Sequence, residues 1–175
     1  MTGDCETDRM FAVRATKKLL DRCGGVSLSD ESTTTVLSDW YATVLFWRPQ
    51  VALFVNEATR VPVFVALAPA ASVVTRFVDQ VAAVFAALGL DPRFVEAELA
   101  AMSEHRVART TSRSVLGSMN DFGFIASAHR DDGEADDLVA LSLRLAHTPC
   151  GPLRASTGFP DLEIRALVER IPGLV

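Results

Sequence analysis

Three apolar runs follow one another in residues 40–67, which read WYATVLFWRPQVALFVNEATRVPVFVAL. The runs are rich in β-branched and aromatic residues, and two short turn-like segments, Arg48 to Gln50 and Asn56 to Arg60, separate them. Short connections of this kind join neighbouring antiparallel strands, so the stretch predicts a three-stranded antiparallel meander. Pro62 lacks an N–H for the ladder, which places it at a strand start or on an edge strand. Because apolar residues scarcely alternate with polar ones, we expect both faces of the sheet to be covered.

The segment before this meander predicts one more strand and a short helix. Met10 to Ala15 is β-prone, and Thr16 is a suitable N-cap for a helix at Lys17 to Cys23, which Gly24 would end. Residues 25–38 are polar and rich in Ser and Thr, which is typical of a loop.

The segment after the meander predicts helices that cover the sheet and one further strand. Apolar residues recur there at helical spacing, and capping residues or Pro and Gly mark the ends. The predicted elements are a helix from Pro69 or Ser72 to Leu88, a helix from Arg93 to Met102 behind Asp91-Pro92, a strand from Arg106 to Thr111, a helix capped by Ser112 or Ser114, an acidic loop from Asp131 to Asp137, and helices from Asp137 to His147 and Asp161 to Arg170.

The composition agrees with a globular protein of the α+β class. The chain has 175 residues, of which 49% are hydrophobic and 22% charged, enough for one core without metal or disulfide support. We predict an antiparallel sheet of four to five strands covered by about five helices, in a single domain over residues 10–175 that follows a flexible acidic tail, residues 1–9. The apolar stretches 61–71 and 81–90 are too short to cross a bilayer, so no membrane partner is expected.

Charge and cysteine content exclude several classes of protein. A formal charge of −5 disfavours binding of nucleic acid by bulk charge but leaves room for a local basic site. Cys5, Cys23 and Cys150 lie far apart, which argues against a disulfide framework and for the reducing cytoplasm. The three histidines show no metal-ligand spacing, so we expect neither a metal nor a cofactor.

Two basic segments are the candidate ligand-binding residues. Cations and hydroxyls at a strand-to-helix junction suit phosphate oxygens. The alternative interpretation is a solvated helix start for the first segment and an edge strand with protective charges for the second. The candidates are Arg14, Lys17 and Lys18 in the first segment, and Arg109, Arg113 and Ser114 in the second.

Two further pairs of residues are weaker candidates for chemistry. Asn120 and Asp121 lie about 100° apart on the predicted helix, so they would not share one face. Asp121 facing the basic segment would be either a structural salt bridge or a catalytic carboxylate. His147 and Cys150 invite a cysteine and histidine catalytic interpretation, against which a buried cysteine is the plainer alternative.

Five segments carry a resemblance that extends over nearly the whole chain after the tail. The chain resembles an uncharacterised bacterial family, a domain of unknown function, and its first half looks more loosely like proteins of plasmids and transposable elements. Such a family has Asn where this chain has Thr43. The resemblance implies one compact cytoplasmic domain and no established activity. The segments are RATKKLL at 14–20, DWYA at 39–42, LFVNE at 53–57, RSVLGSMNDF at 113–122 and TPCGP at 148–152.

These observations favour a binding module for nucleic acid or another phosphate-bearing ligand. A small hydrolase or nuclease that uses Asp121 with Arg113 and Asn120, in a cleft beside Lys17, is the first alternative. A protein-interaction or homodimerisation domain is the second alternative.

Overall fold

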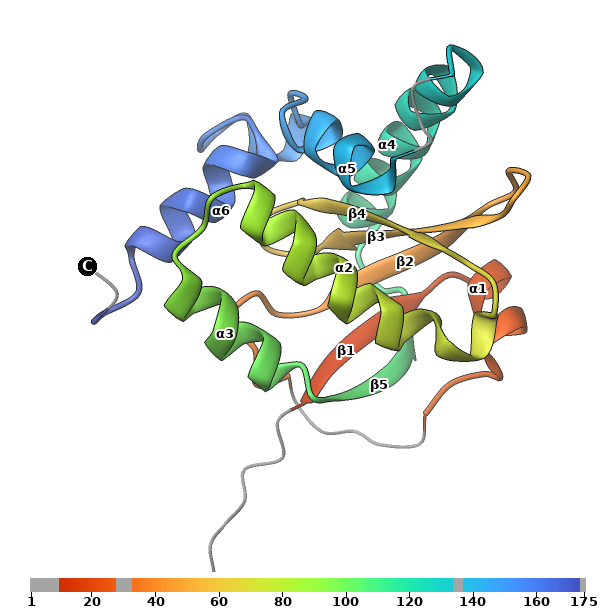
Figure 1. Cartoon of the computed structure of the whole chain (residues 1–175), viewed down its shortest axis with the longest axis horizontal. Helices are drawn as coiled ribbons and strands as arrows, with labels where there is room; N and C mark the ends of the chain where they lie inside the picture. The colour runs from red at the N-terminus through yellow and green to blue at the C-terminus, as the bar shows by residue number, and fades with distance from the viewer. Residues whose placement is uncertain (1–9, 28–32, 134–136, 174–175) are drawn as a thin grey trace, which may run out of the picture.

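The predicted meander is present in the computed structural model (Figure 1). Strands β2 (Trp40–Leu45), β3 (Val51–Asn56) and β4 (Pro62–Ala66) pair in antiparallel order. Pro62 begins β4, and β4 is an edge of the sheet, where a missing N–H costs no ladder hydrogen bond. The structure describes residues 10–27, 33–133 and 137–173, and the predicted tail, residues 1–9, lies outside them.

The sheet has five strands in the order β4-β3-β2-β1-β5, and it is mixed rather than wholly antiparallel. β1 (Met10–Ala15) pairs in parallel with β2 on one side and with β5 (Glu104–Arg109) on the other. The antiparallel prediction is therefore wrong for β1 and β5. Parallel strands need crossover connections, and α1 (Lys17–Cys23) supplies the one between β1 and β2. β5 also begins two residues before the predicted strand at Arg106.

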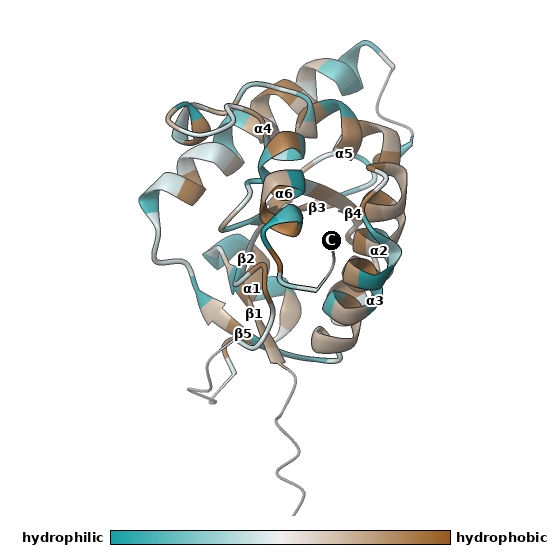
Figure 2. Cartoon of the chain, turned by 90° about the vertical axis from the view of Figure 1, so that its left-hand side faces the viewer, coloured by the Kyte–Doolittle hydropathy of each residue, from teal (hydrophilic) through white to brown (hydrophobic). Residues whose placement is uncertain are grey.

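One face of the sheet is covered by α2 (Val73–Ala87) and α3 (Pro92–Ala101), which lie to the right of the sheet in Figure 2. The Phe77 ring of α2 stacks on Phe54 of β3, with 4.0 Å between the ring centroids, and meets the Trp40 ring edge-on at 4.9 Å. These aromatic pairs fill the centre of the larger core.

The opposite face is covered by α4 (Arg113–Asp131) and α5 (Leu138–Ala146). Ser112 caps α4, as predicted, because its hydroxyl accepts a hydrogen bond from the Val115 N–H. α5 lies along the edge strand β4, where the Ser142 hydroxyl accepts a 3.0 Å hydrogen bond from the Phe64 N–H. Both faces are thus covered, as the weak alternation of the strands predicts.

The described residues form six α-helices, the last of which is α6 (Pro160–Glu169), and the α+β class is confirmed. In the described part of the chain, the stretch Ala70–Ala87 is long and apolar enough to cross a bilayer by length and composition alone. Its buried face packs against the sheet, as that of a core helix would. The predicted acidic loop is shorter than expected: Asp131 still belongs to α4, and residues 134–136 lie outside the described part.

Candidate anion-binding site

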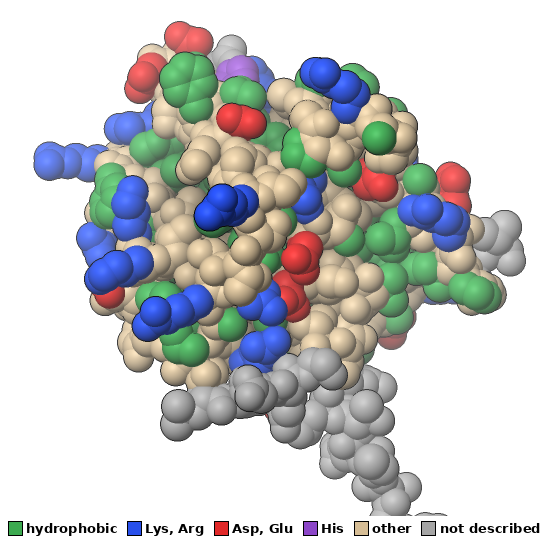
Figure 3. Space-filling view, turned by 180° about the vertical axis from the view of Figure 1, so that it is seen from behind, with side chains coloured by type: hydrophobic (Ala, Val, Ile, Leu, Met, Phe, Trp, Pro, Cys, Tyr) green, Lys and Arg blue, Asp and Glu red, His purple; other side chains and the backbone are tan. Residues whose placement is uncertain are grey.

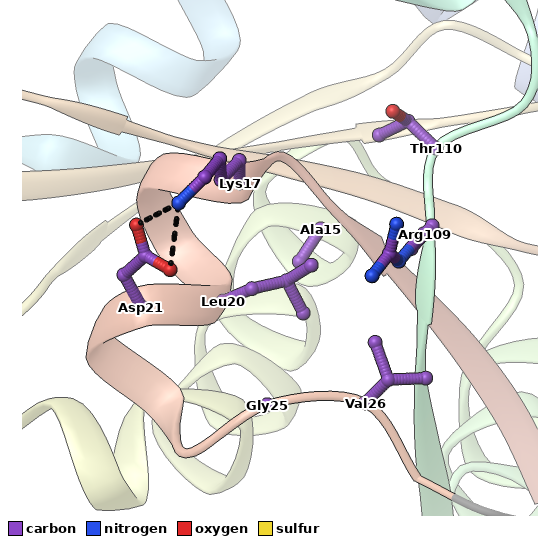
Figure 4. A pocket seen from close by; sticks show the side chains of 8 residues that line it. All are labelled: Ala15, Lys17, Leu20, Asp21, Gly25, Val26, Arg109 and Thr110. Atoms are coloured by element: carbon purple, nitrogen blue, oxygen red, sulfur yellow. Dashed lines mark hydrogen bonds and ion pairs between the residues drawn. The ribbon is translucent and has the colours of Figure 1, made fainter.

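A pocket of about 520 Å³ lies at the carboxyl ends of two parallel strands. Ala15 at the end of β1 and Arg109 at the end of β5 are register partners, so both strands end at the same edge of the sheet. Ligands of sheets with parallel strands commonly bind at such edges. Eight residues line the pocket (Figure 4): Ala15, Lys17, Leu20, Asp21, Gly25, Val26, Arg109 and Thr110.

The pocket brings together one cation from each predicted basic segment. Figure 4 shows Lys17 on the helix side and Arg109 with Thr110 on the strand side, with Leu20 and Ala15 between them. The Lys17 ammonium contacts the Asp21 carboxylate at 2.9 and 3.3 Å, and both side chains are well exposed. Exposed ion pairs of this kind contribute little free energy, so Lys17 can exchange Asp21 for an anion at low cost. Within the described residues, the Arg109 guanidinium has no hydrogen bond or ion pair.

Arg14 is engaged within the protein and positions the end of β5. Its Nε lies 2.5 Å from Oδ2 of the buried Asp39, whose other oxygen accepts a hydrogen bond from the Thr33 hydroxyl. Its Nη1 donates to the carbonyl of Arg109 at 3.3 Å. Arg14 therefore holds the backbone from which the Arg109 side chain extends.

Lys18 does not line the pocket, although it follows Lys17 directly. Its ammonium lies 5.6 Å from the centroid of the Phe46 ring, on the hairpin between β2 and β3. A helix turns about 100° per residue, so neighbouring lysines on α1 point in different directions.

Arg113 and Ser114 occupy the first turn of α4, and both are exposed. The Ser114 hydroxyl accepts a 3.3 Å hydrogen bond from Nη2 of Arg60, a residue that the sequence did not indicate. Arg60 has a φ of 62°, the left-handed region, because it closes the turn between β3 and β4. Burial lowers the pKa of Arg60, and its Nε and Nη1 are buried without a partner among the described residues.

Asn120 and Asp121 are both exposed on α4. In the described part of the chain, no hydrogen bond or ion pair joins Asp121 to Arg113 or Asn120, and Asp121 does not line the pocket with Lys17. Burial raises the pKa of Cys150. The Ser118 hydroxyl and the charge of Arg60 partly offset that rise, and the negative charge of Asp121 adds a smaller one.

Cys150 and His147 do not form a catalytic pair. The nearest polar partner of the Cys150 sulfur is the Ser118 hydroxyl, at 3.7 Å. His147 is occupied elsewhere, with Nε2 3.5 Å from the Asp161 carboxylate and Nδ1 2.6 Å from the Leu143 carbonyl. A thiol with a raised pKa is a poor nucleophile near neutral pH. Over the described residues, no cluster of three or more His, Cys, Asp or Glu could hold a metal ion.

Sequence reasoning missed the hydroxyl network that fixes the loop between β5 and α4. The buried Tyr41 hydroxyl lies 3.0 Å from the Thr111 hydroxyl and accepts a 3.2 Å hydrogen bond from the Ser112 N–H. Tyr41 thereby holds the chain just beyond Thr110, which lines the pocket. The DWYA segment was the available signal, but nothing in the sequence pairs it with a loop 70 residues away.

One family matches most of the chain. The family described as Domain of unknown function (DUF6933) matches residues 12–163. The chain belongs to this family. All five segments that carry the sequence resemblance lie inside the matched part of the DUF6933 domain, so the resemblance to a domain of unknown function is confirmed. A bacterial origin and a link to mobile elements stay predictions. Neither the curated proteins nor the solved structures give a match.

Proposed function

We propose that this DUF6933 domain is a binding module for a phosphate-bearing ligand, received by the pocket between α1 and β5. One observation carries the proposal. Lys17 and Arg109, which are 92 residues apart in the sequence, line one pocket at the carboxyl ends of parallel strands. The cysteine content suggests that the domain meets its ligand in the cytoplasm.

The chemistry of the lining residues supports this class of ligand. A guanidinium presents a planar fork to two phosphate oxygens, and the Lys17 ammonium adds a point charge. The Thr110 hydroxyl can donate a further hydrogen bond. Leu20 and Val26 add an apolar wall that suits a ring or a sugar. A volume of about 520 Å³ lies in the range of small-molecule pockets.

The pocket predicts that Arg109→Ala weakens binding of inorganic pyrophosphate and of nucleoside triphosphates. Loss of a charge-assisted hydrogen bond is expected to raise the dissociation constant roughly 10- to 100-fold. Isothermal titration calorimetry at low salt measures the change, and binding should weaken as salt is added.

Arg170→Ala is the matched control, because Arg170 is an exposed arginine at the end of α6, on the side of the molecule away from α1 (Figure 1). It should bind as the unaltered protein does. Equal affinities for Arg109→Ala and Arg170→Ala would contradict the assignment of the pocket, as would the absence of any heat with either probe.

A further inference from the structure

A second surface on the other side of α1 joins an exposed aromatic ring to several cations. Phe46, on the hairpin between β2 and β3, is 56% exposed. The Lys18 ammonium lies 5.6 Å and the Arg22 guanidinium carbon 5.8 Å from the centroid of its ring. Arg48, two residues further along the hairpin, is also exposed. We name Phe46, Lys18, Arg22 and Arg48 the aromatic–basic surface.

The hairpin is held against its surroundings, so the ring of Phe46 is presented from a fixed support. Nη1 of Arg22 donates a 2.6 Å hydrogen bond to the side-chain oxygen of Gln50, which ties α1 to the hairpin. Trp47 is buried next to Phe46, where it stacks on Phe64 and donates through Nε1 to the Ser127 hydroxyl at 3.2 Å. The exposure of Phe46 is therefore a feature of an anchored turn.

Positive charge gathers on this side of the molecule, although the chain as a whole carries −5. Lys and Arg side chains crowd the left of Figure 3, the side on which α1 and the hairpin lie, and few acidic side chains interrupt them. Asp21 is the single acid in the sequence of α1, and it is paired with Lys17 rather than with Lys18 or Arg22. A further cation, Arg130, lies over the Trp47 ring at 5.5 Å.

We propose that the aromatic–basic surface binds single-stranded nucleic acid, with a base stacked on Phe46 and backbone phosphates on Lys18, Arg22 and Arg48. The positive charge of this surface favours a polyanion. The exposed ring of Phe46 favours a polyanion whose own aromatic groups are free to stack. Bases in a duplex are stacked on one another, so only an unpaired strand offers such a face.

This inference goes beyond the proposed function and does not depend on it: both ligands carry phosphate, but the two sites share no residue. Lys17 lines the pocket, whereas Lys18 and Arg22 lie against Phe46. The two sites can therefore be tested separately in the whole chain.

The test is fluorescence anisotropy with labelled oligouridine and oligothymidine strands of about 12 nucleotides, a length typical of single-strand sites. Phe46→Ala and Phe46→Leu should both weaken binding roughly tenfold, because leucine keeps the apolar bulk but has no aromatic face. The logarithm of the affinity should fall with the logarithm of the salt concentration with a slope of about −2, and Lys18→Ala should reduce that slope by about 0.7. Comparison of the two affinities shows whether the surface prefers RNA or DNA.

Phe124→Ala is the matched control, because Phe124 is an 80% exposed phenylalanine on α4 with no cation over its ring in the described part of the chain. It should bind both strands as the unaltered protein does. Thermal unfolding of each variant shows whether the fold is kept, and Phe46→Trp should bind about as tightly as the unaltered protein because it keeps an aromatic face.

The inference would be overturned by no binding of either strand, by equal affinity of Phe46→Ala and Phe124→Ala, or by equal affinity for a duplex of the same length. Tight binding of polyglutamate in place of the strands would also overturn it, in favour of an acidic protein partner. If the strands bind and pyrophosphate does not, the inference stands and the proposed function fails. If pyrophosphate binds and the strands do not, the proposed function stands and the inference fails.

Discussion

Glu98 of α3 is a carboxylate that is only 2% exposed. Its two oxygens accept hydrogen bonds from the backbone N–H groups of Val36 and Leu37, each at 3.1 Å. These bonds tie α3 to the segment that leads into β2. Burial raises the pKa of Glu98 above its ordinary value, and the two hydrogen bonds only partly offset that rise.

The raised pKa predicts how stability depends on pH. The folded protein holds the Glu98 proton more tightly than the unfolded chain does. The contribution of this carboxyl to the free energy of unfolding is therefore smallest above its folded pKa. Its contribution improves as the pH falls through the folded pKa toward the ordinary value. The free energy of unfolding of the unaltered protein, minus that of Glu98→Gln, should therefore be larger at about pH 5 than at about pH 7. Urea denaturation at both values measures the difference, and a constant or smaller difference at the lower pH would contradict the prediction.

Arg60 carries buried N–H groups that no described residue accepts, and burial lowers its pKa. An unsatisfied buried donor is a cost to the folded state. Arg60→Met keeps the length and apolar stem of the side chain and removes that cost. We expect the free energy of unfolding to stay unchanged or to rise by about 1 kcal/mol, as measured by urea denaturation.

Arg76 is the matched control for Arg60. Its Nε is also buried without a partner among the described residues, but its Nη1 and Nη2 donate to the carbonyls of Ala66, Leu67 and Pro69, where the chain passes from β4 to α2. Arg76→Met should lower the free energy of unfolding by about 1–3 kcal/mol. A loss as large in Arg60→Met would mean that the Arg60 guanidinium is well satisfied in solution.

At the scale of elements, α4 carries one glycine on its outer face and one on its packed face. Gly117 is exposed in the second turn of the helix, and a Cβ there would meet no atom within 4 Å. Glycine in a helix interior costs about 1 kcal/mol relative to alanine. Gly117→Ala should therefore stabilise the protein by up to about 1 kcal/mol, which circular dichroism would detect as a rise in Tm.

Gly123 provides the comparison on the packed face of the same helix. A Cβ at this position would lie 3.2 Å from Cδ2 of Leu45 on β2. The helix gain is the same, but the side chain of Leu45 must move to accept the new methyl group. Gly123→Ala should raise Tm less than Gly117→Ala does, or lower it. Equal gains in Tm would show that the Leu45 side chain moves aside at no cost.

α1 shows how a short helix can serve two surfaces. Lys17 faces the pocket, while Lys18 and Arg22, one turn apart, face the hairpin. The sequence presents Lys17 and Lys18 as one basic run. Their separation follows from the helical turn and from the position of β5 on one side and the hairpin on the other.

At the scale of the whole molecule, the order of the strands decides where the candidate pocket lies. Because β1 lies between β2 and β5 and is parallel to both, the ends of β1 and β5 form a common edge that bears Ala15 and Arg109. A wholly antiparallel sheet would have placed these residues at opposite edges. The charge of −5 is thus an average over a surface with a distinctly basic side.

The sequence by itself determined the elements whose signals are local. β1 and α1 match their predicted bounds, and the meander, the Pro62 edge strand and the Ser112 cap were predictable, because turn residues, caps and apolar runs act over a few neighbours. It also indicated Lys17 and Arg109 as candidate ligand residues from their residue type alone, a prediction that binding experiments must test.

Only the tertiary structure decided which of these residues meet. The parallel pairing of β1 with β5 depends on a crossover of nearly ninety residues, and no local signal specifies it. The same pairing joins Lys17 to Arg109 in one pocket. The pairing of β1 with β2 brings Arg14 to Asp39, and the position of α1 beside the hairpin places Lys18 next to the exposed Phe46. Local preferences define elements, whereas contacts between distant side chains depend on how those elements pack.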